Sequence, residues 1–226
     1  MDGSQPPVAS TMHGPPFLVA HRAGNHLDDL RSAERLGIPL IEADVRLFAG
    51  RLEVRHEKTV GPIPILWDRW KLAPPWTPRL LLDELLDAAA DDTELLLDLK
   101  GGDPRLAAGV ARALERRGRA AVSVCSQSWA QLEPFAHVDG VRTIHSVGGA
   151  RALQALHARF ADRLLDGVSI HRKLLDADVV AALHERAGLV ISWPVATVAE
   201  ARDLAAWGVD GLITERYEAL TGALAR

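Results

Sequence analysis

Eight short apolar runs, each followed by a stretch of helical character, recur along this chain from residue 17 onward. The runs cover residues 17–20, 40–45, 94–99, 121–125, 141–145, 167–170, 189–193 and 209–214. Strands that alternate with helices in this way predict a parallel sheet. Eight such units in about 250 residues is the count of a closed (β/α)8 barrel, the TIM barrel. A doubly wound open sheet is the rival, but no glycine-rich phosphate loop follows the first run.

Some segments lie outside this alternation. Residues 1–16 are rich in Pro, Gly, Ser and Thr and have no periodicity, so they predict a flexible N-terminal tail. Residues 51–56 alternate between apolar and polar and predict a strand or strand extension, whereas residues 61–78 predict a loop. The predicted organisation is therefore a tail at 1–16 followed by a single α/β domain, the barrel, at 17–226.

Composition excludes several partners. The formal net charge is −4 and no basic block stands out, so nucleic acid is not expected as a partner. No apolar run reaches the roughly 20 residues of a membrane helix. The single cysteine, Cys125, cannot form an internal disulfide, and no signal peptide is evident, so we expect a cytoplasmic protein. Nothing in the sequence sets an oligomeric state.

An acidic pair interrupts the second apolar run. In the segment Ile41-Glu42-Ala43-Asp44-Val45, the two carboxylates are separated by one residue. Side chains alternate between the two sides of a strand, so Glu42 and Asp44 would point the same way while their apolar neighbours pack on the other side. Two carboxylates crowded on one face repel each other unless a cation lies between them. A divalent metal ion is the simplest such cation.

Other polar residues also close apolar runs, and in a barrel the active site lies at the C-terminal ends of the strands. Asp98 ends the third run and would join Glu42 and Asp44 as a third carboxylate. Oxygen ligands without sulfur suit Mg²⁺ or Ca²⁺. The residues that close the runs are His21, Arg22, Glu42, Asp44, His56, Glu57, Asp98, Lys100, His145, His171, Arg172 and Trp193.

Basic and proton-carrying groups complete this set. Arg22 and Lys100 would lie near the carboxylates as phosphate-binding cations. His21 and His56 would flank them and could transfer protons near neutral pH. Such a set suits phosphoryl transfer. Each member also has a plain structural interpretation, such as a surface ion pair or a hydrogen-bonded rim histidine, and His145 and His171 fit a structural rim equally well.

These motifs resemble the glycerophosphodiester phosphodiesterase family of phospholipase-C-like phosphodiesterase barrels. The matching pieces span nearly the whole chain after the tail and occur in the family's order. They are His21-Arg22, Ile41-Glu42-Ala43-Asp44-Val45, His56-Glu57, Leu97-Asp98-Leu99-Lys100, Ser192-Trp193-Pro194-Val195 and the stretch at 208–214. The resemblance implies a TIM barrel that hydrolyses a phosphodiester, with a glycerophosphodiester-like or lysophospholipid-like small molecule as substrate.

The resemblance also implies a role for each matched residue. His21 and His56 correspond to the acid/base pair. Glu42, Asp44 and Asp98 correspond to the ligands of a divalent metal ion, Ca²⁺ or Mg²⁺. The remaining matches would bind substrate: Arg22 and Lys100 as phosphate clamps and Trp193 as the aromatic that shapes the pocket.

The sequence departs from the family's pattern at three positions. The family has a Pro-Glu-Asn-Thr element after its His-Arg-Gly, whereas a shortened segment here aligns Asn25 with the family's Asn and leaves Gly24 in place of the Glu. Asp98 stands where Glu is usual, and Glu57 where Asp is usual. The loss of one acidic pocket group keeps open a catalytically inactive barrel that binds a phosphate ligand.

A second alternative is a metal-independent isomerase or lyase acting on a sugar phosphate, since residues 208–214 could form a barrel phosphate site. Chelation separates it from the metal-dependent hydrolase, because only the hydrolase would lose activity in EDTA.

Overall fold

Eight parallel strands close into a barrel at the centre of the computed structural model, which describes residues 15–60, 63–68, 71–73, 77–118, 121–136 and 138–224. They follow the order β1-β13-β12-β11-β10-β9-β8-β2, and pairing of β1 with β2 completes the ring. The strands are β1 (Phe17–Ala20), β2 (Leu40–Phe48), β8 (Glu94–Leu99), β9 (Val122–Ser126), β10 (Val141–Val147), β11 (Gly167–His171), β12 (Val190–Trp193) and β13 (Gly211–Thr214). The predicted TIM barrel is confirmed, and each of its strands coincides with one predicted apolar run.

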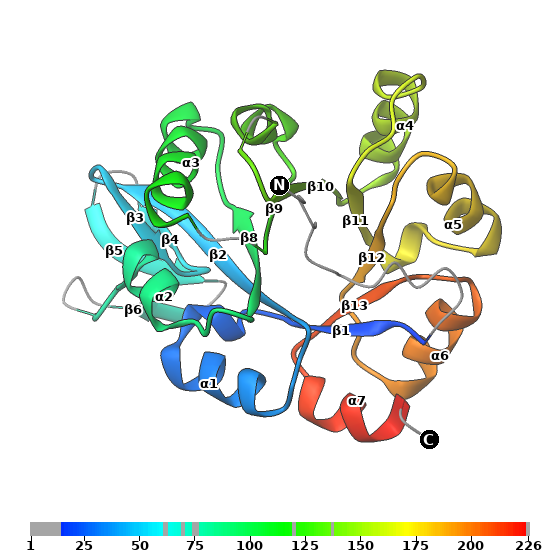
Figure 1. Ribbon diagram of the computed structural model, residues 1–226, viewed down its shortest axis with the longest axis horizontal. Coiled ribbons are helices and arrows are strands. Elements are labelled where there is room, and N and C mark those ends of the chain that lie inside the picture. The colour runs from blue at the N-terminus through cyan, green and yellow to red at the C-terminus, as the bar shows by residue number, and fades with distance from the viewer. Residues whose placement is uncertain are drawn as a thin grey trace, which may run out of the picture.

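Helices surround the ring of strands (Figure 1). They are α1 (Leu27–Arg35), α2 (Leu82–Ala88), α3 (Pro104–Arg117), α4 (Ala150–Arg159), α5 (Ala177–His184), α6 (Val198–Ala206) and α7 (Tyr217–Leu224). Short 3-10 segments are η1 (Ala23–Asn25), η2 (Trp129–Phe135) and η3 (Arg172–Leu174). The segment η2 contains Pro134, which has no backbone N–H to donate, and it replaces the α-helix predicted there.

Residue types set where several helices begin. Asp103 caps α3 by accepting a hydrogen bond from the backbone N–H of Arg105 at 2.9 Å, with Pro104 at the first helical position, as the Asp-Pro pair predicts. Thr197 and Glu200 form a reciprocal capping box at the start of α6. These caps end the loops that leave the C-terminal ends of the strands, which is where a barrel carries its site.

Apolar side chains form an inner and an outer cluster. The inner cluster fills the barrel with Val19, Leu40, Leu96, Cys125, Ile144, Leu189, Ile191 and Ile213. The outer cluster lies between the strands and the helices and takes Ile41, Ala43 and Val45 of β2. Because side chains alternate along a strand, Glu42 and Asp44 share the inner face with Leu40, as the sequence predicts.

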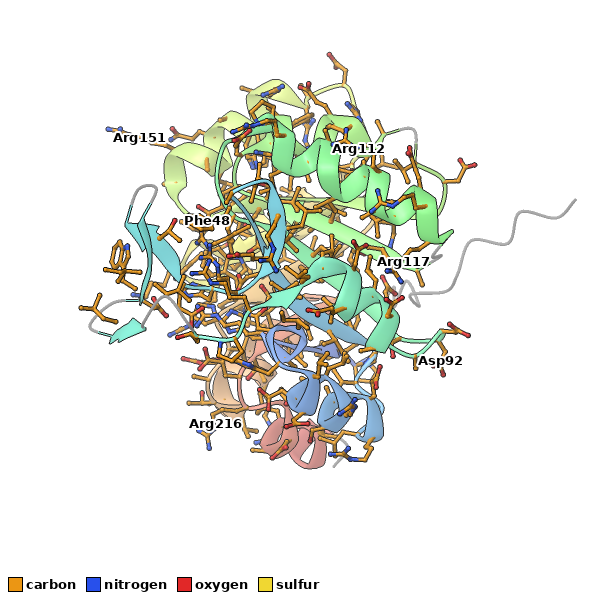
Figure 2. The ribbon with its side chains drawn as sticks, turned by 90° about the vertical axis from the view of Figure 1, so that its left-hand side faces the viewer. Phe48, Asp92, Arg112, Arg117, Arg151 and Arg216 are labelled. Carbon is orange, nitrogen blue, oxygen red and sulfur yellow. The ribbon has the colours of Figure 1, made fainter. Side chains whose placement is uncertain are left out.

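An insertion between β2 and α2 departs from the regular alternation. The strands β3 (Arg51–Val54) and β7 (Leu80–Leu81) extend the barrel wall in antiparallel pairing, and β4 (Lys58–Val60), β5 (Ile63–Asp68) and β6 (Lys71–Ala73) form a separate three-stranded antiparallel sheet. Figure 2 shows this small sheet standing away from the barrel. The prediction of a loop over 61–78 is wrong for β5 and β6. In β5 the buried Leu66 lies between the exposed apolar residues Ile65 and Trp67, so the segment lacks the alternation of apolar and polar residues that marks a strand.

Of the predicted tail at 1–16, residues 1–14 lie outside the described residues. Among the helices of the described chain, none is long and apolar enough to cross a membrane.

Candidate metal centre and active site

Three carboxylates meet inside the barrel where β2 and β8 run side by side. Asp44 and Asp98 are register partners across the two strands, and Glu42 lies two residues earlier on the same face of β2. One oxygen from each of the three side chains lies within 4.8 Å of the others. A set of carboxylate oxygens suits Mg²⁺ or Ca²⁺. The structure therefore brings the predicted triad together, and its residues could hold a divalent ion.

Because the three carboxyl groups are buried close together, their negative charges are costly and their pKa values shift. Burial raises the pKa of Glu42 well above its ordinary value, and the negative charge of Asp44 adds to the effect. Burial also raises the pKa of Asp98. Asp44 behaves differently, because the charge of Lys100 and hydrogen bonds from Lys100 and Asn25 outweigh burial and hold its pKa below the ordinary value. The three groups thus need positive charge close by.

Lys100 supplies part of that charge from the end of β8. Its Nζ lies 2.9 Å from Asp44 Oδ1 and donates a hydrogen bond to Asp98 Oδ2. Burial alone would lower the pKa of Lys100, but the charges of Asp98, Asp44 and Glu42 outweigh it and raise the pKa well above its ordinary value. The ammonium predicted to clamp phosphate therefore points at the carboxylates themselves.

The loop after β1 closes over the same carboxylates. Arg22 has a left-handed backbone with φ of 59°, and its N–H donates to Glu42 Oε2 at 2.6 Å. Asn25 holds Asp44 twice: its Nδ2 donates to Asp44 Oδ2 at 2.8 Å, and its Oδ1 accepts from the Asp44 backbone N–H at 2.8 Å. Asn25 was not predicted as a site residue, although its match to the family's Asn was a usable signal.

Gly24 explains how the shortened loop fits. A Cβ built at this position would lie 2.7 Å from the Cβ of Ala43 and 3.1 Å from the carbonyl oxygen of Glu42. Contacts this short do not occur between real side chains, so the loop packs directly onto β2 only because residue 24 is glycine. The loop is thus tighter because residue 24 has no side chain, and a Glu at this position would not fit the backbone as it stands.

Two histidines flank the carboxylates, and each has an acidic partner. His21 continues from β1, with its Nδ1 3.3 Å from Glu215 Oε1, and burial and then the charge of Arg22 lower its pKa to about 4. The ring of His56 follows β3, with its Nδ1 3.0 Å from Asp68 Oδ2. The sequence predicts both histidines but neither partner, because Glu215 lies near the other end of the chain and Asp68 lies in the segment predicted as a loop.

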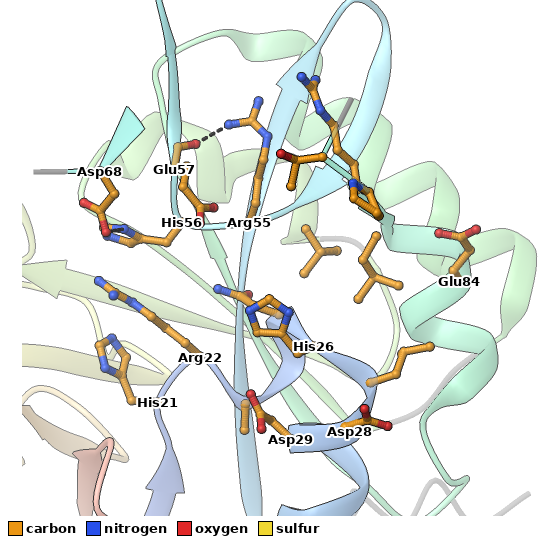
Figure 3. A pocket seen from close by; sticks show the side chains of 18 of the residues that line it. His21, Arg22, His26, Asp28, Asp29, Arg55, His56, Glu57, Asp68 and Glu84 are labelled. Carbon is orange, nitrogen blue, oxygen red and sulfur yellow. Dashed lines mark hydrogen bonds and ion pairs between the residues drawn. The ribbon is translucent and has the colours of Figure 1, made fainter. Parts of the chain in front are cut away.

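A cleft of about 1010 Å³ opens beside these groups (Figure 3). Its lining includes His21, Arg22, Asn25, His56, Asp68 and Glu215. One wall is held by buried Glu53, which accepts hydrogen bonds from Arg55 at 2.7 Å and from Arg79 at 3.0 Å. The arrangement can bind an anion between cations and histidines, next to the carboxylates of Glu42 and Asp44, which the lining residues Arg22 and Asn25 contact.

Other residues singled out in the sequence fall further away. Trp193 packs against the inner cluster of the barrel and meets the ring of His171 edge-on, with ring centroids 5.0 Å apart. Neither residue lines the cleft described above. His145 is buried among the aromatic rings of Trp129 and Phe160, outside the inner cluster, which favours its structural interpretation.

Fold and site together define a (β/α)8 barrel with an acidic triad, two flanking histidines and a cleft at its mouth. No protein-family model and no curated protein matches this sequence. Solved structures do match, and those named below are glycerophosphodiester phosphodiesterases or a related phosphodiesterase.

A phosphodiesterase from Oleispira antarctica, in complex with the product sn-glycerol-3-phosphate, has a TM-score of 0.74 and 17% identity over 93% of this chain and 97% of its own. The glycerophosphodiester phosphodiesterase of Thermotoga maritima has a TM-score of 0.74 and 16% identity over 93% and 99% of the two chains. That of Parabacteroides distasonis has a TM-score of 0.75 and 20% identity over 93% and 97%. The chain therefore has the fold of these enzymes, and the predicted resemblance is confirmed at the level of the fold.

Proposed function

We propose that this protein is a metal-dependent phosphodiesterase that acts on a glycerophosphodiester-like or lysophospholipid-like substrate. The observation that carries the proposal is the placement of His21, His56 and Arg22 at a cleft beside the triad of Glu42, Asp44 and Asp98. The same groups form the phosphoryl-transfer set that the sequence predicts. The fold shared with solved phosphodiesterases, one of which holds sn-glycerol-3-phosphate, supports the same class of substrate.

The metal ion, Ca²⁺ or Mg²⁺, would be held by the three carboxylates and would supply charge for the non-bridging phosphate oxygens. Arg22, whose Nε lies 3.7 Å from Asp44 Oδ2, would bind the phosphate from the cleft side. One histidine would take the proton of the nucleophile, and the other would give a proton to the leaving alcohol. The nucleophile is water or a substrate hydroxyl next to the phosphate.

The test is a panel of glycerophosphodiesters, lysophospholipids and a chromogenic phosphodiester, each assayed with and without EDTA. We expect release of the alcohol from at least one substrate and loss of that release with chelator. His21→Ala and His56→Ala should each lower turnover by about 10²-fold or more, the typical contribution of acid/base catalysis. His157→Ala, a histidine of α4 that does not line the cleft, is the matched control and should retain wild-type turnover.

A second candidate function is that of a barrel that binds a phosphate ligand without catalysis. Gly24 favours it, because this position leaves no room for the family's acidic group. Stabilisation by Ca²⁺ or Mg²⁺ without turnover of any phosphodiester would favour this alternative. Turnover that persists in EDTA would instead favour metal-independent chemistry.

A further inference from the structure

The small sheet of the insertion reaches the candidate active site through one side chain. Asp68 is the last residue of β5, and its Oδ2 lies 3.0 Å from Nδ1 of His56. Both side chains are partly enclosed, with 32% of Asp68 and 27% of His56 exposed. Both also line the cleft, so their contact lies within the site and not on its outer surface (Figure 3).

The contact determines which nitrogen of the His56 ring carries a hydrogen. An ionised carboxylate only accepts hydrogen bonds, so Nδ1 of His56 must carry the hydrogen. The nitrogen that can give or take a proton during the reaction is then Nε2, the other nitrogen of the ring. A carboxylate that holds one ring nitrogen both orients an imidazole and selects its tautomer, as second-layer partners do at many sites.

The two histidines have different surroundings. His21 is buried beside the guanidinium of Arg22, an environment that disfavours a second positive charge. Its acidic neighbour, Glu215, is 67% exposed and lies 3.3 Å away. Near His56 are its chain neighbours Arg55 and Glu57 and, at the end of β5, Asp68. Arg46 of β2 donates from its Nε to the His56 carbonyl oxygen at 3.2 Å, and Asp44 interacts electrostatically with His56. Of these, Asp68 is the group in direct contact with the ring.

We propose that Asp68 is a positioning residue for His56 and that the insertion sheet thereby forms part of the catalytic apparatus. In the step, an oxygen–phosphorus bond forms from the nucleophile, whose proton passes to His21. The phosphorus–oxygen bond to the leaving alcohol breaks, and that oxygen takes the proton from Nε2 of His56. His56 is left neutral with Nδ1–H still bonded to Asp68, and solvent restores the proton to His56 and removes the one on His21. The inference rests on the proposed phosphodiesterase function.

Leaving-group dependence tests this role. An alkyl alcohol needs a proton as it departs, whereas p-nitrophenolate does not. Asp68→Ala should lower kcat on an alkyl glycerophosphodiester by about 10- to 10²-fold. On a p-nitrophenyl phosphodiester the same variant should lose less than about threefold, with KM unchanged, because general acid catalysis is then not required. Asp68→Asn, which keeps an acceptor oxygen but no charge, should fall between Asp68→Ala and wild type.

Lys58→Ala is the matched control for disturbance of the insertion. Lys58 begins the neighbouring strand β4, is exposed, and does not line the cleft; its Nζ lies 5.4 Å from the centroid of the Trp67 ring. It should leave the ratio of the two substrate activities at the wild-type value. Equal losses on both substrates in Asp68→Ala, or a wild-type rate on the alkyl substrate, would overturn the proposal.

Nitrogen-15 NMR of the His56 ring separates the failure of this inference from the failure of the proposed function. In wild type the neutral ring should carry its hydrogen on Nδ1, and in Asp68→Ala that preference should be lost. This outcome supports the contact even if no phosphodiester is hydrolysed, in which case the proposed function fails. An unchanged ring tautomer in Asp68→Ala would reject Asp68 as the positioning residue whatever the activity.

Discussion

At the scale of single residues, Lys100 stands out because its ammonium lies among the groups that would bind the metal ion. Lys100→Met removes that charge and takes from the fully buried Asp44 its closer ionic partner, leaving Arg22 at 3.7 Å. Breaking a buried ion pair from one side costs about 3–5 kcal/mol, so we expect the free energy of unfolding in EDTA to fall by that order. Added Ca²⁺ or Mg²⁺ should recover more stability in the variant than in wild type, as measured by thermal unfolding. Lys173→Met, at an exposed lysine of η3, should respond to the ions as wild type does, and an identical response in Lys100→Met would contradict the assigned role.

At the scale of elements, the short loop η1 depends on close contact with β2. Gly24→Ala would place a methyl group 2.7 Å from the Cβ of Ala43, so the loop must shift and carry Asn25 and Arg22 with it. Overpacking of this kind costs about 1–3 kcal/mol, and the displaced Asn25 would also loosen Asp44. We expect a lower midpoint in denaturant titration and weaker binding of divalent ions by calorimetry. Adding Ala43→Gly removes the shortest contact but leaves that with the Glu42 carbonyl, so it should restore only part of the loss.

The barrel strands could be predicted from the sequence, whereas the strands of the insertion could not. The barrel strands and the triad were predictable, because each strand is an apolar run and alternation places Glu42 and Asp44 on one face. The insertion was not predictable, because its exposed face is apolar too: Leu66 is 3% exposed, whereas Trp67 and its register partner Leu72 are 37% and 75% exposed. The segment therefore lacks the alternation of apolar and polar residues that marks a strand. Asp68 therefore gave no sign of its contact with His56. The sequence predicts Lys100 near the carboxylates, but as a phosphate clamp. That its ammonium pairs with Asp44 and Asp98 depends on the pairing of β2 with β8, which no local pattern shows.

At the scale of the whole molecule, stability should depend on pH through a buried histidine between the barrel and its helices. Burial, and then the charge of Arg163, lower the pKa of His145 to about 4, despite the opposing charge of Asp166. The unfolded chain takes up this proton near pH 6.5, so its stabilising contribution is complete above pH 6.5 and is lost as pH falls toward 4. We expect His145 to account for a loss of unfolding free energy on the order of 2 kcal/mol between pH 7 and 4.5, measured by unfolding at each pH.

In His145→Phe the ring still packs against Trp129 and Phe160, and no hydrogen bond to Nδ1 is lost, since this atom has no partner among the described residues. The variant should keep a smaller slope of the same sign, because the pKa of His21 is also lowered to about 4. A slope equal to that of wild type would show that the acid sensitivity of the barrel arises elsewhere.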